Sequence, residues 1–210
     1  MYLNVFSIIF IAVILGAQIL RSFLGHLRIA NFMEIRKMRI IKFVFLSAIF
    51  VVFLLLFYQS YLQYEAWFSS EFSRHLLEQS VNFDNFNFRI NYFVFYAITR
   101  FFAPYLISLV AALIFLILAR KLNKKHNDKF FEPEEPWFGA LAIFLLGHPS
   151  WFFYLISLIL IYLIIHLLSL IISRKSLVIS LYYLWLPTAI FVIIINKWLI
   201  ELELWKLLKI

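Results

Sequence analysis

The sequence predicts an all-α integral membrane protein, a bundle of transmembrane helices that crosses the bilayer five or six times. Hydrophobic residues make up 65% of the 210 positions and charged residues only 14%, whereas soluble domains carry roughly 25% charged residues. The apolar residues form long blocks, and a block of about 18 or more with few charges is typical of a membrane span. Most of the 19 basic residues lie in short connections between the blocks. We therefore expect one helical membrane domain over residues 1–210.

Composition also limits the partners and the chemistry. The net charge is +8, but the basic residues do not form one face interleaved with aromatic side chains, so we expect the lipid bilayer and no nucleic acid as partner. The absence of cysteine excludes disulfides, thiolate metal sites and cysteine nucleophiles. No metal or cofactor signature is present, and we expect neither. The extramembrane segment after the second block lacks an N-x-S/T sequon, which fits a prokaryotic plasma membrane.

The first two blocks, residues 3–23 and 41–64, are predicted spans. The first has no basic region before it and no A-x-A-like site after it, so we interpret it as a retained span rather than a signal peptide. The connection between the blocks holds one acid, Glu34, and five basic residues. By the positive-inside rule the loop 24–42 is cytoplasmic. Its basic residues are Arg28, Arg36, Lys37, Arg39 and Lys42.

The next connection, residues 65–91, carries four acids and two basic residues and is predicted to lie outside. Apolar residues at near-helical spacing in Ala66 to Leu77 indicate an interfacial helix. The stretch from Val81 to Phe88 alternates loosely with period two, but no partner strand is visible, and we interpret it as a loop.

The third span is predicted over residues 92–119. Arg100 lies eight residues into this block, where its side chain can snorkel to the outer interface; the alternative is a buried functional arginine. Five basic residues follow the block and assign the loop 120–134 to the cytoplasm. They are Arg120, Lys121, Lys124, Lys125 and Lys129.

The fourth apolar tract, Trp137 to Ile172, is too long for one span and is broken at Gly147-His148-Pro149. We expect a short broken or re-entrant helix at 135–148 and a span at 150–173. The short limb of about 14 residues measures roughly 21 Å, and its crossing decides between six spans and five. A last span is predicted at 177–196, with the tail 197–210 along the interface.

Ionisable residues at mid-bilayer depth are scarce, which disfavours an ion-coupled carrier. His166 is the exception, and we interpret it as a neutral histidine bonded to a neighbouring helix. The candidate catalytic residues are Glu135, Glu134, Glu132 and Asp128, the densest carboxylate cluster of the chain. Two close carboxylates can share a proton as general acid and base. Acids before a proline-started helix can equally complement the helix dipole.

The segment Glu135-Pro-Trp-Phe-Gly-Ala-Leu-Ala-Ile-Phe-Leu-Leu-Gly-His-Pro149, followed by the apolar run Trp151 to Leu168, resembles the active-site region of type IV prepilin peptidases. In that family a G-x-G-D-x-K box opens a short helix that ends in Gly-Trp-Pro or similar. Aligning Gly147 with the terminal glycine places Glu135 at the position of the catalytic aspartate. The resemblance implies a membrane endopeptidase that cleaves pilin-like precursors.

Two functions follow as expectations. One is a divergent prepilin-peptidase-like enzyme, in which Glu135 with Glu134, Glu132 or Asp128 activates water at the cytoplasmic face. The other is a non-catalytic membrane subunit or scaffold that packs against partner membrane proteins. We favour the second, because the family's other catalytic aspartate has no counterpart in the preceding spans.

Overall fold

The computed structural model describes residues 2–24, 34–83, 88–127, 130–173 and 181–208, and in these ranges the chain is mostly helical. Among the described residues, four helical segments are long and apolar enough to cross a membrane, and two apolar helices are shorter. The prediction of an all-α membrane protein is confirmed at this level. The long segments are Arg39–Ser69, Tyr92–Lys125, Ser150–Ile171 and Leu181–Leu199; the short ones are Leu3–Ile19 and Glu135–Leu146.

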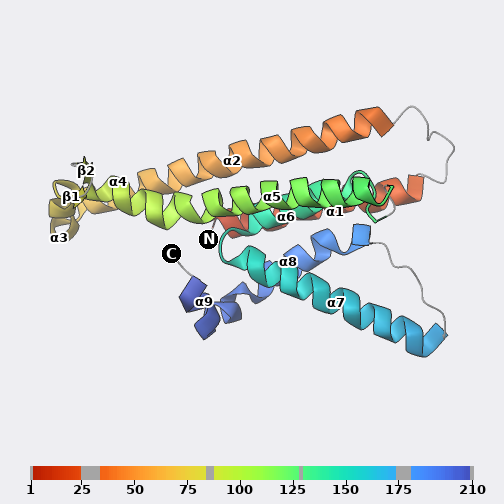
Figure 1. The fold of residues 1–210 in the computed structure, drawn as a ribbon. Coiled ribbons are helices and arrows are strands. Elements are labelled where there is room, and N and C mark those ends of the chain that lie inside the picture. Colours follow the sequence, from red (N-terminus) through yellow and green to blue (C-terminus); the bar gives the residue numbers. More distant parts are fainter. Residues whose placement is uncertain (1, 25–33, 84–87, 128–129, 174–180, 209–210) are drawn as a thin grey trace.

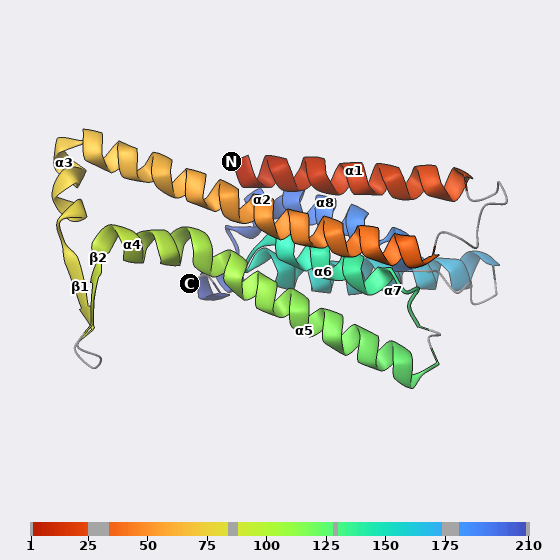
Figure 2. The same ribbon diagram turned by 90° about the horizontal axis from the view of Figure 1, so that it is seen from above.

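Successive long elements run in opposite directions (Figures 1 and 2). The ends of α1, α5 and α7 lie at the same end of the molecule as the starts of α2, α6 and α8. The helices are α1 (Tyr2–Leu24), α2 (Glu34–Ser69), α5 (Ala103–Lys125), α6 (Glu135–Leu146), α7 (Ser150–Ser173) and α8 (Trp185–Leu199), followed by the short α9 (Glu203–Leu208).

The short helix α6 occupies the interior of the bundle. It packs against α1, α2, α5, α7 and α8, and its residues are buried except for the half-buried Trp137. The helix is apolar on nearly every side, and such a helix is stable only where all of its faces are shielded from water. The predicted short limb is therefore a central packing element of the protein.

Gly139 lets α5 and α8 approach α6 closely. A Cβ atom built at this position would lie 2.6 Å from Cε1 of Phe115 and 2.9 Å from Cζ3 of Trp185. The two rings themselves meet edge to face, with centroids 5.5 Å apart. Because core packing leaves few voids, this aromatic pair fills the space that a larger side chain in place of Gly139 would need.

The second helix extends further than predicted. With 36 residues it is about 54 Å long at 1.5 Å per residue, and it includes 66–69, which we expected in a separate interfacial helix. Only Glu71–Arg74 (α3) and a 3-10 turn at His75–Leu77 remain of that helix. The extension is held by aromatic contacts with α4 (Tyr92–Ala97), since Trp67 lies 6.1 Å from Tyr92 and 4.9 Å from Tyr96 between ring centroids.

The prediction of a loop from Val81 to Phe88 is wrong at both ends of that range. Ser80–Phe83 (β1) pairs antiparallel with Phe88–Asn91 (β2), with Ser80 opposite Asn91. The partner strand follows almost at once in the sequence. Asn91 then caps α4, because its side chain accepts a hydrogen bond from the Phe93 amide at 2.8 Å.

The third span is continuous but contains a π-helical turn, Ile98–Phe102, between α4 and α5. The amide of Ala103 donates to the carbonyl of Ile98, and the next residue, Pro104, has no amide to donate. The wider turn accommodates that missing bond. Arg100 lies within this turn and is exposed, which contradicts the alternative of a buried functional arginine and fits a side chain at the interface.

The break between α6 and α7 is a tight turn covered by the C-terminal tail. Gly147 has a φ of +70°, a conformation that suits glycine. The amide of His148 donates to the carbonyl of Pro104 at 3.1 Å, and its Nε2 donates to the carbonyl of Leu208, 2.6 Å away. In α9 Trp205 stacks on Phe153 of α7 with centroids 5.4 Å apart, so the tail folds back onto the turn.

Candidate functional site

The chain approaches α6 through a loop that one asparagine holds in place. Asn123, in the last turns of α5, is buried. Its Oδ1 accepts from the amides of Phe130 and Phe131 at 3.1 and 3.0 Å, and its Nδ2 donates to the carbonyl of Phe131 at 2.8 Å. Because all three bonds reach the same short segment, Asn123 determines where the glutamates that follow enter the bundle.

The start of α6 buries two adjacent glutamates. Glu134 is 6% exposed and Glu135 is 2% exposed, with Pro136 second in the helix. The Glu134 side chain makes no capping hydrogen bond; its backbone carbonyl accepts from the amides of Trp137 and Phe138. The positive end of the helix dipole favours carboxylates here, but burial of a charge is costly without hydrogen-bonding partners.

Tyr182 connects Glu134 to the first helix. Its hydroxyl donates to Oε2 of Glu134 at 3.4 Å, and its backbone carbonyl accepts from Nε2 of Gln18 at 3.4 Å. All three residues are buried. Tyr182 lies in a 3-10 turn, Leu181–Tyr183, just before α8. The junction therefore joins α1, the start of α6 and the start of α8 through polar contacts within an apolar bundle.

The structure brings together only part of the predicted carboxylate cluster. Glu134 and Glu135 are buried side by side at the helix start, whereas Glu132 is exposed in the preceding loop. Asp128 lies outside the described residues. Among the residues that the structure describes, no group of three or more histidine, cysteine, aspartate or glutamate side chains could hold a metal ion. Chemistry here would depend on Glu134 and Glu135 with the Tyr182 hydroxyl.

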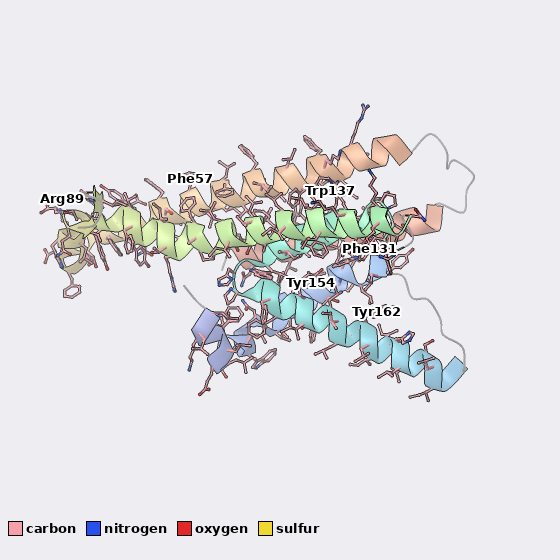
Figure 3. The ribbon with its side chains drawn as sticks, in the orientation of Figure 1. Phe57, Arg89, Phe131, Trp137, Tyr154 and Tyr162 are labelled. Atoms are coloured by element: carbon pink, nitrogen blue, oxygen red, sulfur yellow. The ribbon has the colours of Figure 1, made fainter. Side chains whose placement is uncertain are left out.

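Trp137 forms a second polar feature of the same helix, which the sequence analysis missed. Its ring lies between α2 and α5 (Figure 3), 5.7 Å from the ring of Phe45. Above the ring lie the guanidinium of Arg120, at 4.3 Å from the centroid, and Nζ of Lys42, at 5.9 Å. The sequence feature that could have indicated this contact is a tryptophan at the start of a helix that faces two basic loops.

His166 does not make the expected interhelical hydrogen bond among the described residues. It is half-buried, and its ring stacks on Tyr162, one turn earlier in α7, with centroids 6.2 Å apart and planes at 9°. Figure 3 labels Tyr162 on the part of α7 that diverges from the other helices. The stack is local to the helix.

The chain matches no known protein family, no curated protein and no solved structure. The resemblance to prepilin peptidases over residues 135–168 therefore stays a prediction.

Proposed function

We propose that this protein is a non-catalytic membrane scaffold or subunit, multi-pass in a prokaryotic plasma membrane. The observation that carries the proposal is the position of α6. A carrier or an intramembrane protease needs polar access to its interior, whereas apolar side chains of α6 such as Leu141, Ile143 and Phe144 occupy the middle of this bundle and are at most 3% exposed. A filled centre suits a protein that works through its outer surfaces.

We further propose six crossings, with the loops 24–42 and 120–134 in the cytoplasm. Arg100 and Arg120 are twenty residues apart in one nearly continuous helical segment, or about 30 Å at 1.5 Å per residue, which equals the thickness of the hydrocarbon core. The amide of His148, in the turn after α6, donates a hydrogen bond to the carbonyl of Pro104. Pro104 follows Arg100 by about 6 Å along the helix at the same rise per residue. Over α6 the chain therefore passes almost across the hydrocarbon core, and the surrounding helices shield it from lipid. A helix of this length that was exposed to lipid could not cross the core.

The surfaces offered to partners are apolar faces of the long helices. On α2 and α7 large side chains remain at least half exposed, which suits lipid or the helices of another membrane protein. They include Phe43, Leu46, Phe50, Leu54 and Phe57 of α2, and Ile159, Leu160, Ile164, Leu167 and Ile171 of α7.

The test is purification of the tagged chain from its native membrane in a mild detergent. The scaffold proposal predicts a complex with a fixed partner at constant stoichiometry, and replacement of Ile164 and Leu167 by alanine should release the partner. The matched control is Leu113→Ala with Ile117→Ala on the exposed face of α5. Recovery of a lone monomer in every detergent would contradict the proposal.

A second candidate function is a divergent prepilin-peptidase-like endopeptidase, and the observation in its favour is the burial of Glu134 and Glu135 at one helix start. It predicts that Glu135→Gln abolishes cleavage of a co-expressed pilin-like precursor, whereas Glu132→Gln, in the exposed loop, leaves cleavage intact. Absence of cleavage by the unaltered protein would exclude this function.

A further inference from the structure

Two cations from different helices converge on one tryptophan at the basic end of the bundle. Arg120 comes from the last turns of α5 and Lys42 from the first turns of α2, and both are exposed. Within the described part of the chain the structure pairs neither with a carboxylate. The indole Nε1 of Trp137, whose ring lies under both cations, is buried and has no hydrogen-bond acceptor among the described residues.

These three groups are all hydrogen-bond donors. A guanidinium and an ammonium have no acceptor atom, and an indole nitrogen only donates. Two cations that lie over one ring and are not paired with a carboxylate in the described part of the chain are complementary to an anion with several oxygens, and arginine in particular matches phosphate geometry.

Among the described residues, neither Glu134 nor Glu135 forms an ion pair with these two cations. Glu135 lies two residues before Trp137, about 200° around the helix and so on its far side. Glu134 accepts a hydrogen bond from Tyr182 near the start of α8. The other charged residues on the adjacent turns of α2 and α5 are basic, namely Arg39, Lys121 and Lys124.

Depth in the membrane identifies the source of the phosphate. In the orientation proposed above, on which this step rests, Arg120 lies about 30 Å from Arg100 and so at the cytoplasmic boundary of the hydrocarbon core. Lipid phosphates lie just outside that boundary, and basic residues there attract anionic lipids. A tryptophan is typical of the same zone.

We propose that Lys42, Arg120 and Trp137 form a binding site for the phosphate of an anionic lipid headgroup in the cytoplasmic leaflet. The two cations bind the phosphate oxygens, and the ring of Trp137 lies under both of them. A phosphate bound at this site links the start of α2 to the end of α5, next to the start of α6.

The test measures lipid binding to the purified protein in detergent by native mass spectrometry, with three ligands: dioleoyl-phosphatidylglycerol, dioleoyl-phosphatidylcholine and inorganic phosphate. We expect phosphatidylglycerol to bind most tightly. The double variant Lys42→Gln/Arg120→Gln should weaken this binding about thirtyfold, since each basic residue near an anionic headgroup contributes about fivefold. The control Lys121→Gln/Lys125→Gln removes the same charge from the same end of α5 and should change binding less than about threefold.

Trp137→Leu tests the site without altering charge, because it removes the ring over which both cations lie; it should weaken phosphatidylglycerol binding several-fold. Three results would overturn the proposal: equal binding of the two lipids, an equal loss in the control double variant, or competition by inorganic phosphate as effective as by lipid, which would assign the site to free phosphate. A failure of the scaffold function in the co-purification test would leave these lipid measurements unaffected.

Discussion

Gly139 is the residue on which the closest approach of three helices depends. Gly139→Ala should lower the free energy of unfolding by about 1–3 kcal/mol, because the new methyl group overlaps Phe115 and Trp185. The measurement is the thermal unfolding midpoint in detergent. Gly16→Ala is the matched control, since a Cβ at Gly16 meets nothing within 4 Å and alanine is the better helix former. An equal or higher midpoint for the Gly139 variant would show that the rings yield freely.

Ser7 completes the end of the central helix. Its hydroxyl donates to the carbonyl of Leu145 at 3.1 Å, and the last carbonyls of a helix have no partner within it. Ser7→Ala should therefore cost about 0.5–1.5 kcal/mol, seen as a lower unfolding midpoint. In the control Ser47→Ala the lost bond runs to Val44 in the same helix, and the midpoint should move less. Identical shifts would rule out a special role for Ser7.

Asn123 should control the order of the loop before α6. Asn123→Ala removes three hydrogen bonds to Phe130 and Phe131, and we expect faster hydrogen exchange at both amides. Asn123→Asp keeps the acceptor for those amides and loses only the donor, so exchange should lie between the alanine variant and the unaltered protein. Unchanged exchange in the alanine variant would mean that other contacts order the loop.

At the level of residues the sequence identified Glu135, Glu134, Glu132 and Asp128 as a candidate site, and of these the structure buries the adjacent pair Glu134 and Glu135. The contacts that surround the site could not be found in this way. Tyr182 lies 48 positions from Glu134, and Ser7 lies 138 positions from Leu145. Neither side chain forms part of a local pattern, since an isolated serine or tyrosine in an apolar block looks the same whether it faces lipid or protein.

Among the elements, four of the predicted spans correspond to described helices that are long and apolar enough to cross a membrane, because apolar length alone identifies such a helix. Their packing was not predictable. A helix inside a membrane bundle is apolar both towards lipid and towards protein, so α6 shows no polar face that would have marked it as central. Two differences from the prediction, both in the connection between the second and third predicted spans, have local causes. Aromatic contacts with α4 prolong α2 past Tyr64, and the partner strand of β1 follows only a few residues later.

The position of the tail helix α9 should depend mainly on one aromatic stack, that of Trp205 on Phe153. Trp205 is 7% exposed and Trp198 is 60% exposed. Trp205→Ala should detach α9 from the turn at His148, at a cost of about 3 kcal/mol, and accelerate hydrogen exchange over residues 203–208. Trp198→Ala should leave exchange there unchanged. If both variants behave alike, the tail is held by contacts other than the stack on Phe153.

For the whole molecule, the absence of cysteine makes a direct topology test possible, because any introduced thiol is the only one present. The variants Ser80→Cys, Lys125→Cys and Glu201→Cys place it in β1, at the end of α5 and after α8. Six crossings predict that an impermeant maleimide labels the first and third in intact cells, and the second only after permeabilisation. Labelling of the Glu201 variant only after permeabilisation would mean five crossings.

The central position of α6 has a consequence for how the protein is made. Its 12 residues are too few to remain in a bilayer alone, since a span needs about 20. As the chain leaves the ribosome, α6 cannot partition into lipid independently and has to enter together with α5 or α7. Membrane insertion of this protein is therefore a cooperative step of its folding, and changes at the contacts of α6 should lower the yield of inserted protein before they alter anything that the mature protein does.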